Sequence, residues 1–221
     1  TYLGDTTGLV NGEFIIDQIE NLSDTSQRIR YIVTPYTVDD FGNIRCTGPN
    51  DTTYIQVEPG LNVTFTPDTD TICSEETTNI LITSRSRTAL PLRFRYRIDA
   101  EFDDSVHIGY AELADTSMIS SGYVIADTLI NLSDTAQQVF IIVTPYVQGG
   151  GISRCPGLPD TAIVWLEPTS KVVLVPQSDT ICDNEPVDIT VTSPTRSTLP
   201  VLFSYNVIYD ADSIDYTLAG A

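Results

Sequence analysis

The chain has 221 residues and a formal net charge of −19, with 30 acidic side chains against 11 basic ones. Because so acidic a surface repels phosphate, we expect neither nucleic-acid binding nor direct insertion into or attachment to anionic membranes. Hydrophobic residues make up 41% of the chain, yet no apolar run approaches the roughly 18 residues of a membrane span, which indicates a soluble protein with a packed core. The first ten residues lack the basic start and apolar stretch of a signal peptide, so we expect a mature piece or an excerpt of a longer protein.

Short runs in which apolar and polar residues alternate recur along the chain. The clearest is LRFRYRI at 92–98, where the apolar residues share one face and three arginines share the other. In chain order the alternating apolar positions are Ile29, Tyr31 and Val33; Thr53, Ile55 and Val57; Leu92, Phe94, Tyr96 and Ile98; Val139, Ile141 and Val143; and Ile163 with Trp165. A period of two is typical of a half-buried strand. Because Pro, Gly, Asn and Asp separate these runs and no stretch shows a capped helical period, the sequence predicts an all-β antiparallel sandwich.

A long internal repeat organises these strands. GEFIIDQIENLSDTSQRIRYIVTPY, from Gly12, aligns without gaps on GYVIADTLINLSDTAQQVFIIVTPY, from Gly122, and DTIC occurs at both Asp70 and Asp179. The period of 109 to 110 residues matches one domain and is too long for a solenoid repeat. Both copies contain the phrase NLSDT, whose Asn, Ser and Asp favour a turn just before the IVTPY strand.

The unit boundaries are expected at two Glu-Pro pairs. Glu58-Pro59 and Glu167-Pro168 each close one strand and precede another, and proline suits a place where sheet pairing stops because it has no N–H. The resulting division is the C-terminal part of one unit at 1–58, a complete unit at 59–168 and the N-terminal part of a following unit at 169–221. A cut into 1–110 and 111–221 fits the chain ends better but splits an apparent strand order.

The unit carries a recognisable combination of motifs. It opens with TIC-x-x-E, from Thr71 and again from Thr180, followed by an ITS or VTS strand and an aromatic strand containing Phe94 and Tyr96. The VTPY strand, a later Cys-x-Gly and a strand ending in Pro complete the order. In this combination the unit resembles the PKD-like and immunoglobulin-like repeats of very large secreted surface proteins of Bacteroidota. The resemblance covers nearly the whole chain, although similar repeats often carry Gly after the TIC cysteine, where this chain has Ser74-Glu75 and Asp183-Asn184.

The resemblance implies tandem immunoglobulin-like (PKD-like) β-sandwiches of about 110 residues each. It further implies a non-catalytic stalk segment of a long repetitive cell-surface adhesin or filament, which spaces a binding tip from a bacterial cell. Export by the type IX route to the cell surface, and a role in cell adhesion or gliding motility, belong to the same expectation. The expected partners are neighbouring repeats of the same chain and, through the parent protein, surface glycans or other cells. The alternative is a carbohydrate- or protein-binding module that uses the variable loops after Ile98 and Val207.

Four cysteines, at Cys46, Cys73, Cys155 and Cys182, show no metal-binding spacing. They favour an oxidised, extracytoplasmic framework. Three disulfide arrangements are open: Cys73 with Cys155 inside the repeat, the local pairs Cys46 with Cys73 and Cys155 with Cys182, or a staple between adjacent units. The fourth interpretation is a set of buried free thiols.

Nine Asp-Ser/Thr pairs are similar to the O-glycosylation acceptor of Bacteroidota. Their hydroxyl residues are Thr6, Thr52, Thr71, Ser105, Thr128, Thr135, Thr161, Thr180 and Ser213. The competing interpretation is turn chemistry, because Asp and Thr side chains hydrogen-bond the nearby backbone at strand ends. The two uses are compatible, since exposed turns are also where glycans fit.

Calcium binding and catalysis are the remaining site classes. Clustered carboxylates at Asp99, Asp103 and Asp104, and at Asp210, Asp212 and Asp215, offer oxygen ligands for Ca²⁺, although the usual role of such clusters is a solvated acidic loop. No other cofactor is expected. The only histidine, His107, has neither a histidine counterpart in the next repeat nor a nucleophile motif beside it. The sequence therefore predicts a protein that is not an enzyme.

Overall fold

The structure is a computed structural model that describes residues 6–100, 106–108 and 116–208. Within these residues the chain forms strands in several sheets and no helix, which confirms the all-β prediction. None of the described residues belongs to a helix with the length and apolar character that a membrane span requires.

The strands between residues 59 and 168 form the centre of the molecule, which we call the central unit. They are β5 (Thr64–Thr66), β6 (Thr69–Cys73), β7 (Ile80–Thr83), β8 (Leu92–Ala100), β9 (Val106–Ile108), β10 (Thr116–Ile119), β11 (Tyr123–Ile125), β12 (Leu129–Asn131), β13 (Gln137–Gly149), β14 (Ile152–Arg154) and β15 (Asp160–Glu167). One sheet has the order β10-β8-β13-β15-β6, with β14 also beside β13, and a second has the order β11-β7-β5. A third ladder joins β12 to β9. All neighbours are antiparallel except β15 and β6, which are parallel.

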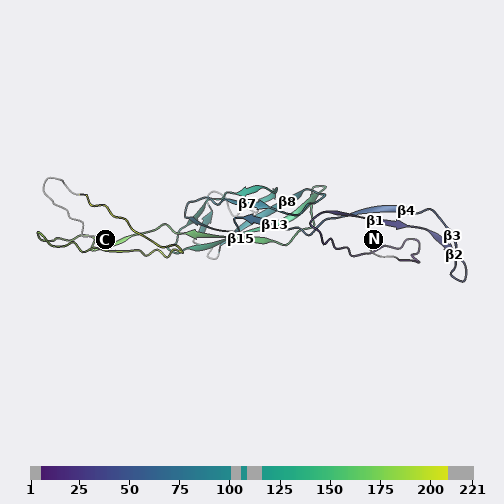
Figure 1. Cartoon of the computed structure of the whole chain (residues 1–221), viewed down its shortest axis with the longest axis horizontal. Helices are drawn as coiled ribbons and strands as arrows, with labels where there is room; N and C mark the ends of the chain where they lie inside the picture. The colour runs from purple at the N-terminus through teal and green to yellow at the C-terminus, as the bar shows by residue number, and fades with distance from the viewer. Residues whose placement is uncertain (1–5, 101–105, 109–115, 209–221) are drawn as a thin grey trace.

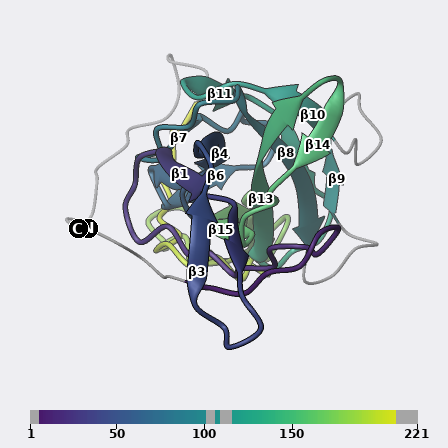
Figure 2. The same ribbon diagram turned by 90° about the vertical axis from the view of Figure 1, so that its right-hand side faces the viewer.

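The hydrophobic core lies between the two larger sheets. Viewed along the long axis of the molecule, β7 and β11 lie across from β13 and β15 (Figure 2). Phe94 from β8, Ile82 from β7 and Ile141 from β13 are completely buried in one cluster, whose members all fall between Val63 and Leu166. Each such side chain stabilises the fold by about 1.5–3 kcal/mol relative to an exposed position. The arrangement is consistent with a β-sandwich.

Alternation along the strands agrees with the predicted apolar faces of β8 and β13. It does not agree in the first copy of the repeat, where Val33, Thr53 and Ile55 are exposed because no buried core forms there. Phe94, Tyr96 and Ile98 are buried while Arg95 and Arg97 between them are exposed, and the predicted positions in β13 are all buried as well. The prediction for the last strand was wrong by one residue. Ala162, Val164 and Leu166 point into the core, and Ile163 and Trp165 are only half-buried on the opposite face. The large side chains suggested the wrong face because both faces of this strand carry apolar residues.

Two flanks extend from the central unit in opposite directions (Figure 1). The N-terminal flank (residues 6–58) contains β1 (Gln27–Val33) paired with β4 (Asp51–Val57), and β2 (Tyr36–Val38) paired with β3 (Ile44–Thr47). The C-terminal flank (residues 169–208) contains β16 (Val173–Val175) paired with β17 (Thr190–Thr192). Neither flank contributes a side chain to the buried core cluster. The boundaries proposed at residues 59 and 168 remain a prediction.

The repeat shows that a segment forms a strand only where a neighbouring strand pairs with it. DTIC at Asp70–Cys73 lies in β6, which pairs with β15, whereas the identical DTIC at Asp179–Cys182 forms no strand. Likewise LRFRYRI forms β8 beside β13, and its counterpart at 201–207 has no ladder. β-propensity is a preference for a paired, half-buried surface, so the same residues remain unpaired where the described chain supplies no neighbouring strand.

Candidate functional site at the junctions between units

The NLSDT phrase folds into a compact loop at each end of the central unit. In the second copy, Asn131 Nδ2 donates to the carbonyls of Thr135 (2.9 Å) and Leu166 (2.9 Å). Its Oδ1 accepts from the backbone N–H (2.9 Å) and the hydroxyl (2.8 Å) of Ser133. Asn131 is buried, and these bonds satisfy its amide as a buried polar group requires. The prediction of a turn before the IVTPY strand is confirmed.

The first copy repeats this geometry. Asn21 Nδ2 donates to Thr25 O (2.9 Å) and Val57 O (3.1 Å), and its Oδ1 accepts from Ser23 N (3.1 Å) and Ser23 Oγ (2.8 Å). In both copies a glutamine two residues after the loop also donates to the serine hydroxyl. The same letters therefore build the same loop, because Asn and Ser side chains bond the nearby backbone.

Each loop holds the beginning of the next unit through backbone hydrogen bonds. Arg87 N donates to Asp24 O (2.7 Å), and Ser26 N donates to Arg87 O (2.8 Å). At the other junction Arg196 N donates to Asp134 O (2.7 Å), and Ala136 N donates to Arg196 O (2.8 Å). Both contacts are parallel β-bridges. We call this arrangement the junction clamp.

A glutamate carboxylate adds a second attachment at each junction. Glu58 accepts from Ala89 N (3.0 Å) and Leu90 N (2.9 Å). Glu167, which is buried, accepts from Thr198 N (3.0 Å) and from the Thr198 hydroxyl. A hydrogen bond to a charged group contributes about 1.5–3 kcal/mol. The Glu of each Glu-Pro pair thus caps a loop of the following unit, and the proline after it is buried.

The two junctions differ in one charged contact. Lys171 forms an ion pair with Asp134 in the NLSDT loop. Its counterpart in the other junction is Asn62, whose amide oxygen accepts from Ser84 Oγ (3.0 Å) and Arg85 N (3.0 Å) instead. The shared part of the junction is therefore the clamp and the glutamate cap, and the exposed ion pair is an addition that contributes little.

Sequence reasoning identified both sides of the junction clamp without seeing that they meet. NLSDT and the ITS or VTS segment recur in both copies, the latter as ITSRSRTAL from Ile82 and VTSPTRSTL from Val191. The contacts, however, run through the backbone of Arg87 and Arg196. A backbone contact leaves no residue-type signal. The only available clue was that the two aligned segments recur together on either side of each Glu-Pro pair.

All four cysteines are exposed free thiols in the structure. The sheet register places Cys73 beside Glu167, at the end of β15, whereas Cys155 precedes its beginning at Asp160. The seven-residue rise along this strand is about 23 Å, far beyond the roughly 7 Å that a disulfide allows between Cα atoms. Cys73 and Cys155 of one unit are therefore at opposite ends and cannot be bridged in this fold.

The local pairs meet the same obstacle. β15 separates Cys155 from the flank that contains Cys182, and β4 separates Cys46 from the central unit, at whose far end Cys73 lies. A staple between adjacent units remains a prediction.

The glycine of Cys-x-Gly has a packing role: a Cβ on Gly157 would lie 2.8 Å from Leu61 O and 2.8 Å from Pro145 Cγ.

The glycosylation candidates in the described part of the chain lie in loops and near strand starts, except Thr71, which lies inside β6. Thr6, Thr52, Thr71, Thr135, Thr161 and Thr180 are exposed, and Thr128 is half-buried with its hydroxyl 3.0 Å from that of Thr77. Four of the paired aspartates accept a hydrogen bond from the next backbone N–H, at Asp51, Asp70, Asp160 and Asp179. The turn chemistry is thus present. Ser105 and Ser213 lie outside the described residues, and glycosylation remains a prediction.

Of the calcium candidates, only Asp99 lies in the described residues. Its carboxylate forms an ion pair with Arg97 (3.3 Å), and no group of three or more potential metal ligands occurs in the described part of the chain. Asp103, Asp104, Asp210, Asp212 and Asp215 lie outside it. His107 pairs through its backbone with Ile130 in the β9–β12 ladder.

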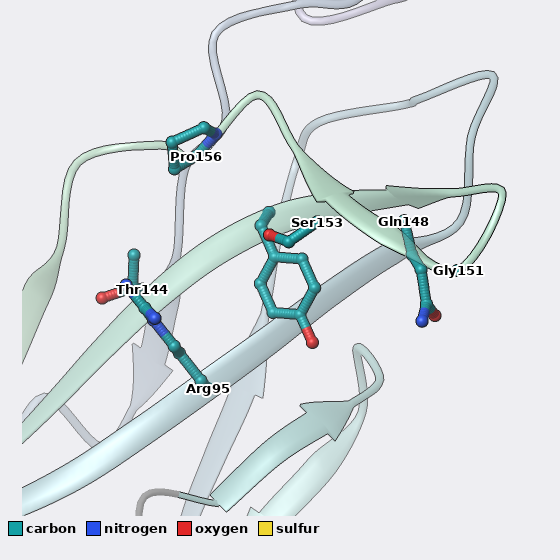
Figure 3. Close-up of a pocket in the computed structure, with 7 residues that line it drawn as sticks. Arg95, Thr144, Gln148, Gly151, Ser153 and Pro156 are labelled. Carbon is teal, nitrogen blue, oxygen red and sulfur yellow. The ribbon is translucent and has the colours of Figure 1, made fainter.

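One open pocket of about 390 Å³ lies on the outer side of the β13–β14 hairpin (Figure 3). Arg95, Tyr146, Gln148 and Ser153 are among the residues that line it. The Tyr146 hydroxyl already accepts a hydrogen bond from Met118 N (3.1 Å). In the aligned units Ser204 replaces Arg95 and Ile44 replaces Ser153, so the polar character of the pocket is not a property of the repeat.

A scan of the sequence against protein-family models gives no match, and a search of curated proteins gives none either.

Proposed function

We propose that this chain is a non-catalytic stalk segment, in which tandem units joined by fixed junctions space a binding tip from a bacterial cell surface. The observation that supports this most strongly is the duplication of the junction clamp, with equivalent backbone bonds at Asp24–Arg87 and Asp134–Arg196. Two junctions with the same bonds set the same relation between successive units. A series of such units is an extended rod, and the described chain is elongated along one axis (Figure 1).

The proposal includes the finer assignment to PKD-like or immunoglobulin-like repeats of a secreted, type IX-exported adhesin of Bacteroidota, on the motifs that carry the resemblance. The acidic surface suits it, because a net charge of −19 keeps parallel rods from adhering to one another. The strand β13 forms antiparallel ladders with β8 and with β15. Such ladders also suit a load-bearing role, because their hydrogen bonds lie side by side along the strand and must break together.

Small-angle X-ray scattering of the whole chain tests the fixed junctions. We compare the wild type with a Glu58→Ala, Glu167→Ala variant, which removes both caps, and extrapolate to zero protein concentration. The wild type is expected to give one extended, narrow distribution of interatomic distances, and the variant a broader one. Glu20→Ala with Asp188→Ala is the matched control, because both side chains are exposed, lie one in each flank and remove the same charge. A wild-type curve that needs the same broad ensemble as the cap variant would contradict the proposal.

The alternative, a carbohydrate- or protein-binding module, makes a different prediction for the same chain. Specific binding to defined glycans on an array would favour it, if changes in the variable loops after Ile98 and Val207 or at the Arg95–Ser153 pocket abolish that binding. The two loops lie largely outside the described residues. A stalk segment is expected to show no selective binding, and changes at the pocket should leave the scattering curve as it is.

A further inference from the structure

The central unit lies in the path of any tension along the chain. The chain reaches the unit through Pro59, shortly before β5, and leaves it through Pro168, directly after β15. The two flanks continue from these points in opposite directions (Figure 1). A pull along the molecule therefore acts on β5 and β6 at one end of the unit and on β15 at the other.

The strands that receive this pull are direct neighbours. β6 pairs in parallel with β15 along its whole length. One further backbone bond continues the ladder at each end: Ile163 N donates to Asp68 O (3.0 Å), and Ser74 N donates to Glu167 O (2.9 Å). The first and the last part of the unit are thus joined by one continuous parallel ladder, which we call the β6–β15 ladder.

Parallel pairing determines how this ladder is loaded. Tension draws β6 back toward Pro59 and β15 forward toward Pro168, so the two strands are pulled along their own axes in opposite directions. The hydrogen bonds of a parallel ladder are evenly spaced and run across the strands, and such a pull loads all of them at once. The strands separate only when several bonds break together, which slows the unfolding step that governs resistance to force.

The other attachments of these strands show where the resistance lies. β15 is held on its other side by β13, along residues 137–143, whereas β6 ends its sheet and has β15 as its only neighbour among the described strands. β5 pairs with β7 over only three residues. The junction clamp gives the load a second path, through Arg87, but by only two backbone bonds. We therefore expect these shorter attachments to open first and the β6–β15 ladder to carry the remaining load.

The repeated DTIC, with the glutamate three residues after it, has a function in this arrangement. On the outer edge of β6, Thr71 N donates to the carboxylate of Asp70 (2.9 Å), and Cys73 N donates to that of Glu76 (2.8 Å). The same two bonds recur in the second copy of the motif. Side chains of the motif thus cover two N–H groups of an edge strand that would otherwise be open to pairing with another chain. The inner edge of the strand is left to β15.

We propose that the β6–β15 ladder is the load-bearing element of the central unit, and that its rupture sets the force at which the unit unfolds under tension. The biological use of this ladder rests on the proposed stalk function, because a stalk transmits load between its binding tip and the cell. The resistance itself follows from the strand order. The unit therefore fails at the parallel pair and not at the longer β8–β13 ladder.

Two pulling directions test the inference by single-molecule force spectroscopy on the whole chain. One handle is a biotin at the N-terminus, and the other is a single native thiol, with the other three cysteines, all exposed, changed to serine. A handle at Cys182, beyond Pro168, pulls β6 against β15 along the strands. A handle at Cys155 lies at the same end of the unit as Leu61, which adjoins Gly157, so it peels β6 from β15 one bond after another.

Through Cys182 the central unit should unfold at about twice the force measured through Cys155, or more, because the bonds of the ladder share the load instead of breaking singly. The main event should release residues 69–167 and add about 300–350 Å of extended chain. Urea unfolding of the two serine-substituted chains should give equal free energies, since substitutions at exposed positions change stability little. The difference in force then comes from the direction of pulling and not from stability.

Neighbouring residues of β6 supply a matched pair of variants. Bonds in a parallel ladder involve alternate residues, so the register assigns the N–H of Asp70 to β15, while the N–H of Thr71 points outward to the Asp70 carboxylate. Asp70→Pro removes a donor from the ladder, and Thr71→Pro removes one from the outer edge, where proline is tolerated. Pulled through Cys182, Asp70→Pro should unfold at a lower force than the wild type, and Thr71→Pro at nearly the same force.

Equal forces in the two pulling directions would overturn the inference, and so would equal losses of force from Asp70→Pro and Thr71→Pro. The comparison of handles changes no residue that forms a bond of the β6–β15 ladder, so it decides the question even where Asp70→Pro does not fold. Failure of this inference is distinct from failure of the stalk. Equal forces leave the fixed junctions as they are, and a broad scattering ensemble contradicts the fixed junctions without changing the resistance of the ladder.

Discussion

Asn131 illustrates how one side chain determines a junction. Its amide satisfies the buried carbonyl of Leu166 at the end of β15 and closes the loop that holds Arg196. Asn21 makes equivalent bonds in the N-terminal flank, outside the buried core. The same residue in the same loop is therefore structural in both places, but its effect on the central unit depends on where the core lies.

Asn131→Ala is expected to destabilise the central unit by about 1–3 kcal/mol, because it leaves a buried carbonyl without its donor. Asn21→Ala should leave the unfolding of the central unit nearly unchanged, since that residue lies beyond the junction and distant sites act independently. Urea denaturation of both variants measures the difference. Equal losses for the two variants would contradict this assignment.

Asp39 is the residue for which a pH effect is expected. Its carboxylate accepts from the backbone N–H of Asn43 (2.9 Å) and of Phe41 (3.0 Å) in the β2–β3 turn. These two hydrogen bonds lower the pKa of Asp39 below its ordinary value of 3.8, and the bond from Asn43 has the larger effect. Because the folded pKa is the lower one, the turn keeps its full stabilisation above pH 3.8 and loses it as the pH falls through the folded pKa.

Carboxyl carbon shifts in a pH titration by NMR test this directly. Asp39 should titrate below 3.8, and the β2–β3 amide shifts should begin to change only in that acidic range. Titration of Asp39 at or above 3.8 would show that the turn bonds are absent in solution.

At the level of strands, the sequence predicted more of the central unit than of the flanks. Alternation in LRFRYRI and in the strand before VTPY identified β8 and β13 with the correct buried faces. It failed at β15, where the large side chains of Ile163 and Trp165 indicated the wrong buried face. The smaller Ala162 and Val164 fill the core there. It could not foresee the unpaired flank strands, because pairing depends on a distant partner that a local pattern does not contain. The junction was predictable as a proline-marked boundary but not as a backbone clamp.

Identical tetrapeptides allow a direct test of partner dependence. Amide hydrogen exchange should be slower across Asp70–Cys73, which pairs with β15, than across Asp179–Cys182, which forms no strand. Equal protection of the two segments would mean that the sequence alone forms the strand.

The aromatic strand gives a second matched comparison. Phe94→Ala should cost about 3–5 kcal/mol in the unfolding of the central unit, as the removal of a fully buried phenyl ring does. Phe203→Ala, at the aligned but exposed position, should change that unfolding by no more than about 0.5 kcal/mol. Thermal or urea unfolding of dilute protein distinguishes them. A large loss of unfolding free energy from Phe203→Ala would contradict the structure, because it would show that the Phe203 ring is buried in a core.

At the scale of the whole molecule, the proposed rod rests on the repeated junction. The clamp recurs with the same backbone donors and acceptors at both ends of the central unit, and the two glutamate caps share one equivalent donor, the backbone N–H of Ala89 and of Thr198. The flanks continue in opposite directions from the central unit. The phrase NLSDT recurs because the junction recurs. Its role in this account is to fix the relation between one unit and the next.

Residual dipolar couplings of the backbone amides measure this relation most directly. They are recorded on the whole chain for the β1–β4 ladder and for the central unit, which lie on either side of the first junction. We predict that one alignment tensor fits both sets of couplings, as a rigid junction requires. Couplings of the β1–β4 ladder that are uniformly reduced relative to those of the central unit would show independent motion and would contradict the stalk account.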